Sequence, residues 1–120
     1  MSDQPLLYVF QSAPYSNAHG PEGLDAVLIG SAFEQSMSLL FLHDGVFQLR
    51  AGQDISASDL KRHSKTFRAL QDLGVEHFYV HDQALLARGL TPEQLMVDVE
   101  LLDAAAVATL LQQQHRVMTF

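Results

Sequence analysis

The chain has 120 residues, 48% of them apolar, which predicts one folded domain spanning residues 1–120. It shows neither an apolar run of roughly 20 residues nor a signal-peptide pattern, so we expect a cytoplasmic domain without membrane contact. Fourteen acidic against seven basic side chains give a formal charge of −7, which disfavours direct binding of nucleic acid, and the absence of cysteine excludes disulfides, thiolate metal sites and thiol nucleophiles.

Short apolar runs typical of strands alternate with helix patterns along the chain, which predicts a βαβ build. The first expected strand covers residues 6–10 and is continuously apolar, as in a strand that is buried on both faces. A loop rich in turn-forming residues follows over residues 12–20. Pro21 suits the first turn of the next helix, which we expect from Glu22 to about Gln35.

The helix expected over residues 22–35 is apolar on nearly all sides. Its apolar residues form two stripes, Leu24, Val27, Leu28 and Ala32 on one and Ala26, Ile29 and Phe33 on the other. Such a helix must be covered on more than one side, either by a wide contact with the core or by another subunit. We favour the subunit interface. Five apolar residues are expected to form it: Val27, Ile29, Phe33, Val46 and Phe47.

The middle of the chain carries one further strand, a turn and a second long helix. The strand is expected at residues 37–42, and the polar turn at residues 43–45 follows it. Ser56 or Ser58 is a suitable N-cap for a helix that runs to about Leu73 and ends at Gly74.

The remaining residues add three strands and two helices. The third strand centres on residues 78–80, and a short helix is expected from Gln83 to about Arg88, with Gly89 ending it. Residues 91–94 have the form of a capping box. The last elements are a fourth strand at 96–99, an Ala-rich helix capped by Asp103 and running to about Gln113, and a fifth strand at 116–120.

Five strands joined by helices through right-handed crossovers predict an open, mainly parallel sheet that is covered on both faces. The expected fold class is therefore a three-layer α/β domain of the flavodoxin-like or Rossmann-like type.

Folds of this type bind ligands at the carboxyl ends of the strands. Residues 12–20, Asp44 and His81 are expected at that edge, so a stand-alone domain that binds an anion or a nucleotide is one hypothesis. However, the sequence contains neither GxGxxG nor GxxxxGK[ST], and it also lacks the GxSxG elbow of hydrolases. We therefore favour an ordinary connecting loop and expect no cofactor.

The histidines do not form a metal-binding pattern. His77 and His81 are four residues apart on the third strand, so they lie about 13 Å from each other and cannot share one ion. The adjacent His81 and Asp82 are the least ordinary polar pair, although a helix N-cap is a sufficient role for Asp82. We expect no metal site.

Five runs, spread in order over essentially the whole chain, carry a resemblance to a known family. They cover residues 10–14, 20–26, 44–49, 85–90 and 116–120. Their residues and spacing resemble the TusC/DsrF-type subunits of the DsrE/DsrF/TusD-like sulfur-relay family. The resemblance implies a DsrE/DsrF-like fold.

The resemblance also implies a function and partners. The chain would be a structural subunit of a TusBCD-like complex, a dimer of heterotrimers with TusB-like and TusD-like subunits. Such a complex relays persulfide sulfur toward 2-thiolation of the wobble uridine of tRNA, and a DsrEFH-like role in sulfur oxidation is the alternative. The downstream sulfur acceptor is expected to bind through the TusD-like subunit.

Finally, the resemblance assigns a special position to His81. In TusD-type or DsrE-type subunits, the sulfur-carrying cysteine stands eight residues before the glycine that corresponds to Gly89, and this chain has His81 there. A persulfide needs a thiolate to accept sulfane sulfur, so we expect a non-catalytic subunit with no catalytic residue. A role for His81 beside a neighbouring subunit's persulfide is a further hypothesis.

Overall fold

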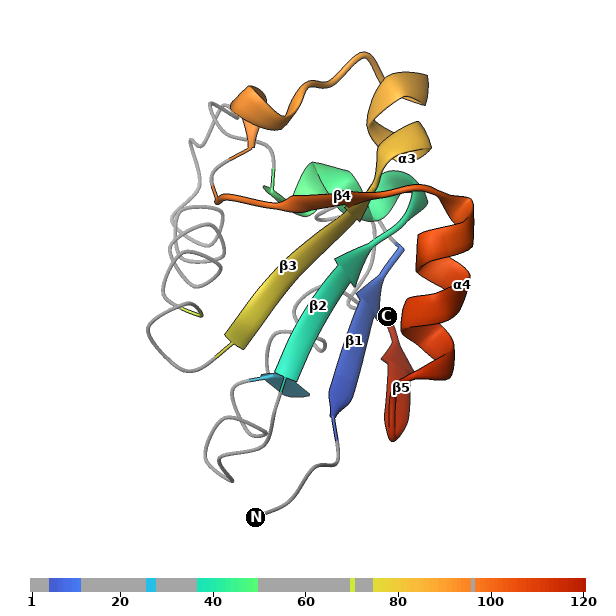
Figure 1. The fold of residues 1–120 in the computed structure, drawn as a ribbon. Coiled ribbons are helices and arrows are strands. Elements are labelled where there is room, and N and C mark those ends of the chain that lie inside the picture. The colour runs from blue at the N-terminus through green and yellow to red at the C-terminus, as the bar shows by residue number, and fades with distance from the viewer. Residues whose placement is uncertain (1–4, 12–25, 28–36, 50–69, 71–74, 96) are drawn as a thin grey trace.

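The computed structural model describes residues 5–11, 26–27, 37–49, 70, 75–95 and 97–120. Its strands are β1 (Leu6–Phe10), β2 (Met37–Phe41), β3 (Val75–His81), β4 (Glu100–Leu102) and β5 (Arg116–Thr119). The helices are α3 (Asp82–Ala87) and α4 (Ala104–Gln112), with two 3₁₀-helices, η1 (His43–Leu49) and η2 (Pro92–Gln94). Figure 1 shows these elements in chain order.

The five strands form one sheet in the order β4-β3-β2-β1-β5, and each described pair of neighbours is parallel. β1 lies between β2 and β5, with Leu6 opposite Met37 on one side and Arg116 on the other. The expected α/β fold with an open parallel sheet is confirmed. Because every strand runs the same way, all the carboxyl ends meet at one edge.

Burial follows the position of each strand in the sheet. All residues of β1 are buried, and β2 is buried except at Ser38, as its continuously apolar sequence indicates. The edge strands β4 and β5 are largely exposed. Their mixed polar and apolar sequences suit strands that are covered on one side only.

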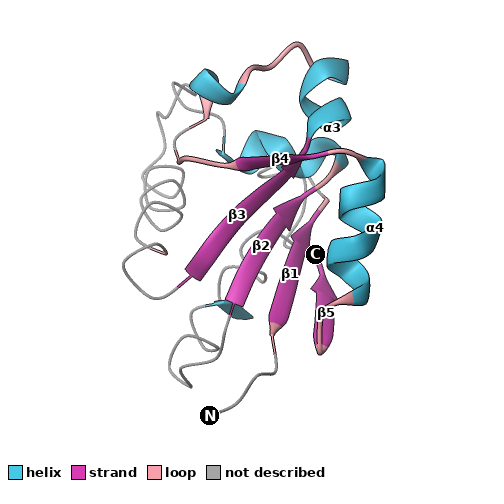
Figure 2. Ribbon diagram, in the orientation of Figure 1, coloured by secondary structure: helices cyan, strands magenta, loops and turns pink. Residues whose placement is uncertain are grey.

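The sheet separates two apolar cores of unequal size. The larger core contains Tyr8, Phe10 and Phe41, and the rings of Phe10 and Phe41 stack with centroids 5.2 Å apart. Residues of η1, of α3 and of the segment after α3 complete it. On the other face, α4 packs Leu110 against β1 and β2, and Figure 2 shows this helix running beside β1 and β5. The three expected layers are thus present.

Local capping signals locate the C-terminal helices well. Gly89 has the left-handed φ of +68° just after α3. The capping box at η2 forms as expected, with the Thr91 N–H donating to Gln94 Oε1 at 2.9 Å. Asp103 caps α4 by accepting a hydrogen bond from the Ala106 N–H at 2.8 Å.

Two of the expected elements differ in the structure. The fourth strand is Glu100–Leu102, so its placement at residues 96–99 is wrong. The strand must start where it pairs with β3, and Glu100 is the residue opposite Tyr79. Val97 instead buries its side chain in the larger core. The alternating apolar pattern of residues 97–99 therefore belongs to a connecting segment and not to a strand paired in the sheet. The turn expected at residues 43–45 is the beginning of η1.

The loop expected at residues 12–20 and the helix expected at 56–73 lie outside the described residues, apart from Leu70. Of the helix expected at 22–35, the structure describes Ala26 and Val27, which are helical. Among the helices of the described residues, none is long and apolar enough to cross a membrane.

Candidate functional site

The carboxyl edge of the sheet is held together by backbone hydrogen bonds that continue past the strand ends. The Leu42 N–H donates to the Phe10 carbonyl at 3.0 Å, and the Gln11 N–H donates to the Phe120 carbonyl at 2.8 Å. The Phe120 N–H in turn donates to the Val9 carbonyl at 2.7 Å. Because these bonds tie the ends of β1, β2 and β5 together, the edge is a fixed platform for the segments that follow the strands.

Gly45 fits η1 directly onto the end of β1. The residue is buried, and its N–H donates to the Leu42 carbonyl at 2.8 Å. A Cβ at this position would overlap the Phe10 carbonyl oxygen and would lie 2.5 Å from the Phe10 carbonyl carbon. Only glycine allows this close approach of two backbones. The close contact therefore explains why glycine stands at position 45, within the run over residues 44–49 that carries part of the family resemblance.

A salt bridge links η1 to the end of α3. The Arg88 Nε donates to Asp44 Oδ1 at 2.9 Å, and Arg88 Nη1 donates to the Ala84 carbonyl at 3.1 Å. The Asp44 carboxylate is more than half exposed, so the pair contributes at most about 1 kcal/mol to stability. Its main effect is to hold α3 against the segment after β2.

His81 and Asp82 stand where β3 passes into α3. His81 Nε2 is 3.9 Å from Asp82 Oδ1, and both atoms are shielded from solvent without a hydrogen-bond partner in the described part of the chain. Such a shielded polar atom typically destabilises a fold by about 1–3 kcal/mol. The N-cap position of α3 belongs to His81, so the N-cap role expected for Asp82 is wrong: the helix starts one residue earlier.

His77 is engaged at the other end of β3. Its Nδ1 lies 2.8 Å from Glu100 Oε1, and its ring stacks on Tyr79 with centroids 5.2 Å apart. Within the described ranges, no group of three or more His, Asp or Glu side chains is placed to hold a metal ion. The absence of a metal site stays a prediction.

The structure divides the five residues expected at a subunit interface. Val27 and Val46 are each 0% exposed and belong to the larger core of this chain. In this single chain they expose no surface, and the assignment of all five residues to a subunit interface stays a prediction. Phe47 is partly buried against the same core. Ile29 and Phe33 lie outside the described residues.

Sequence reasoning missed the features that join distant segments at this edge. Asp44 and Arg88 are 44 residues apart, and the contact of Gly45 with Phe10 also depends on the tertiary fold. Among the described residues, four large apolar side chains are exposed, Leu86 (68%), Leu101 (47%), Val117 (39%) and Leu111 (37%). Their apolar character is visible in the sequence, but their exposure is not.

Comparison with known proteins agrees with this architecture. The model of the DsrE/DsrF-like family matches residues 4–120. A TusC homolog from Vibrio vulnificus is 38% identical over 96% of this chain and 98% of its own length. A TusC homolog from Pseudomonas aeruginosa is 39% identical, with 97% and 98% of the two chains covered. The intracellular sulfur oxidation protein DsrF from Allochromatium vinosum is 38% identical, with 96% and 95% covered. The chain belongs to the DsrE/DsrF-like family.

Solved structures of proteins with low sequence identity to this chain have the same fold. The crystal structure of the YchN protein from E. coli superposes with a TM-score of 0.77 at 19% identity, covering 98% of this chain and 99% of that one. A protein of unknown function from Methanobacterium thermoautotrophicum gives 0.76 at 15% identity, with 98% and 100% covered. The arrangement of sheet and helices is thus shared by proteins of widely different sequence.

Proposed function

We propose that this chain is a non-catalytic structural subunit of a heteromeric, cytoplasmic sulfur-relay complex of the TusBCD type. The proposal rests on the similarity of nearly the whole chain to TusC homologs and on the absence of cysteine from the sequence. The family resemblance further implies that His81 stands where the sulfur-carrying subunits have their cysteine.

The chemistry of sulfur relay explains why the absence of cysteine supports the proposal. In each transfer, the thiolate of the acceptor attacks the outer sulfur of the donor's persulfide. A new S–S bond forms to the acceptor as the S–S bond of the donor breaks, so the acceptor becomes the persulfide and the donor is released as a thiolate. An imidazole cannot be the carrier in this exchange. The sulfur path must therefore run through cysteines of partner subunits, and this chain contributes surface and shape to the assembly.

The partners proposed are a TusB-like and a TusD-like subunit in a dimer of heterotrimers, with the downstream acceptor bound through the TusD-like subunit. The exposed side chains of Leu86 and Leu101 are consistent with a chain that meets other subunits. The pathway proposed is 2-thiolation of the wobble uridine of tRNA, without direct contact between this chain and the nucleic acid.

A role in sulfur oxidation is the second candidate. It is favoured by the relative named for that process, DsrF of Allochromatium vinosum, which is as similar to this chain as the Vibrio vulnificus TusC homolog, at 38% identity in both cases.

Native mass spectrometry of the tagged chain, purified from its own cells, tests the proposal. We expect a heteromer with two partners of similar size, one of which carries a reactive cysteine. A lone monomer or a homo-oligomer would contradict the proposal. Deletion of the gene then separates the pathways: loss of 2-thiouridine from tRNA supports thiolation, whereas intact 2-thiouridine with impaired sulfur oxidation supports the second candidate.

A further inference from the structure

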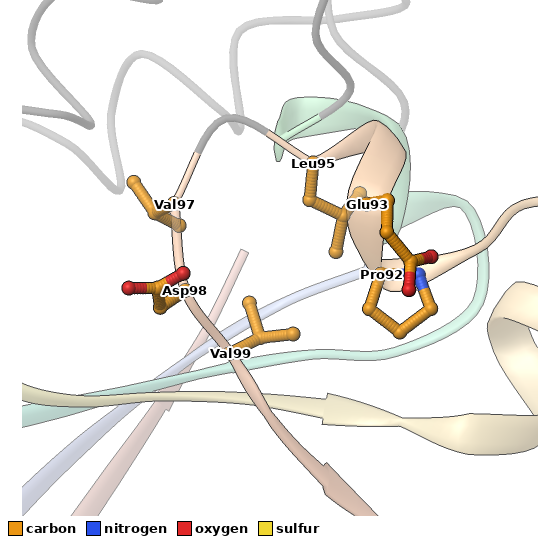
Figure 3. Close-up of a pocket in the computed structure, with 6 residues that line it drawn as sticks. All are labelled: Pro92, Glu93, Leu95, Val97, Asp98 and Val99. Atoms are coloured by element: carbon orange, nitrogen blue, oxygen red, sulfur yellow. The ribbon is translucent and has the colours of Figure 1, made fainter.

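The segment between α3 and β4 forms a hollow on the surface, shown in Figure 3. Its volume is about 330 Å³, and six residues line it: Pro92, Glu93, Leu95, Val97, Asp98 and Val99. Leu95 and Val97 are each only 8% exposed and give it an apolar wall, while Glu93 and Asp98 are exposed. Glu93 and Asp98 stand on two sides of the hollow with Val99 between them (Figure 3). The hollow thus combines an apolar wall, formed by Leu95 and Val97, with a negatively charged rim.

The described residues supply no cation to this rim. The sequence has no Lys or Arg between Arg88 and Arg116. Arg88 already pairs with Asp44, and Arg116 lies on β5, at the opposite edge of the sheet from β4. In the described part of the chain, Glu93 and Asp98 are therefore left without an opposite charge.

The chemistry of the lining narrows the kind of ligand. Glu93 and Asp98 belong to no group of three or more potential metal ligands among the described residues, which disfavours a metal ion. The volume of about 330 Å³ is at the low end for a pocket that takes a whole small molecule. A Lys or Arg side chain has the matching character, because its methylene stem packs on apolar surface while its cationic head remains near water and carboxylates.

We propose that this hollow receives a Lys or Arg side chain from another protein subunit, with the stem against Leu95 and Val97 and the cationic head between Glu93 and Asp98. The surface next to it suits such an interface. Edge strand β4 follows directly, and its Leu101 is 47% exposed. An exposed apolar side chain beside a charged rim is the usual composition of a protein interface. The net charge of −7 further favours a partner surface that is basic.

This inference rests on the proposed function for the identity of the partner, which is another subunit of the relay complex. The test compares Glu93→Gln/Asp98→Asn with Gln112→Lys/Gln113→Lys. Each double variant changes the net charge by the same amount, but the second one does so at exposed positions at the end of α4. The quantity measured is the dissociation constant between this chain and the subunits that co-purify with it, at low and at high salt.

We expect Glu93→Gln/Asp98→Asn to weaken binding about fivefold at low salt, which corresponds to two partly exposed ion pairs. The loss should shrink at high salt because the charges are screened, and the control should bind like the wild type. Equal weakening in both variants, or none in either, overturns the proposal. A lower melting temperature of Glu93→Gln/Asp98→Asn with unchanged binding also overturns it, since the carboxylates would then serve this chain's own fold.

A second measurement stays informative if the chain purifies alone and the proposed function fails. The backbone amide resonances of the chain are followed during titration with n-butylguanidinium and, separately, with n-butylurea, which has the same shape without the charge. We expect saturable shifts at Leu95 and residues 97–99 with the guanidinium, and their loss in Glu93→Gln/Asp98→Asn. No shift at these residues, or equal shifts with the urea, shows that the hollow does not select an amphipathic cation.

Discussion

Replacing Gly45 by alanine is expected to destabilise the chain strongly, because η1 lies directly against the end of β1. The new Cβ would overlap the Phe10 carbonyl oxygen and would lie 3.0 Å from the Gln11 nitrogen. Both atoms belong to the backbone, and both residues are hydrogen-bonded at the sheet edge, Phe10 to the Leu42 N–H and Gln11 to the Phe120 carbonyl. No flexible side chain can yield, so the helix must move away from the strand.

Overpacking of this kind typically costs 1–3 kcal/mol, and a contact with fixed backbone belongs at the upper end, at about 3 kcal/mol. For a chain of 120 residues, the entropy of unfolding is about 0.25 kcal/mol per kelvin near the midpoint. The melting temperature should therefore fall by roughly 12 °C. Circular dichroism during thermal and urea unfolding, on the protein in the assembly in which it purifies, measures both quantities.

Gly89→Ala is the matched control. Gly89 also requires glycine, but only for its φ of +68°, and a Cβ there meets nothing within 4 Å. The same added methyl group should then cost about 1 kcal/mol, through backbone conformation alone. If Gly45→Ala proves no more destabilising than Gly89→Ala, the close contact between η1 and β1 is not real and our explanation of why position 45 requires glycine fails.

Three other substitutions probe separate features. Asp103→Ala should lower stability by about 1 kcal/mol in urea unfolding, because the Ala106 N–H loses its cap, while Asp103→Asn should retain most of it. Burial raises the pKa of Tyr8 above its ordinary value of 10.0, so the folded state holds this proton more tightly. Stability should then fall as the pH rises above about 10, and Tyr8→Phe should remove that part of the pH dependence; an unchanged profile would contradict the burial. Finally, His81→Ala should leave the rate of sulfur transfer by the intact complex unchanged in a radiolabelled-sulfur assay, and a large loss would give this chain an active role.

Much of the local structure could be predicted because it depends on nearby residues. The continuously apolar residues of β1 indicate a strand buried on both faces, and the structure shows it there. Thr91 and Asp103 cap helices through bonds that span three residues, so the sequence alone reveals them. Gly89 likewise marks the end of α3 by its own conformational freedom.

The candidate site was less predictable than the fold. The sequence pattern placed His81 at the end of the third strand, but the shielding of its Nε2 beside Asp82 depends on how α3 leaves the strand. The hollow rimmed by Glu93 and Asp98 has no sequence signature, because its shape comes from a connector folded over the edge of the sheet. The exposure of Leu101 similarly depends on what else covers β4.

The sequence by itself determined the class of fold, the local caps and the absence of any cysteine, since all three depend on residue identity and short spacing. Only the tertiary structure decided which apolar residues lie inside the chain's own core. Val27 and Val46 have the apolar character of interface residues, yet both are fully buried in the chain's own core. β4 begins at Glu100 because that is the residue opposite Tyr79 on β3. Burial and pairing register are set by contacts between distant segments, and apolar patterns cannot distinguish a side chain that meets its own chain from one that meets another.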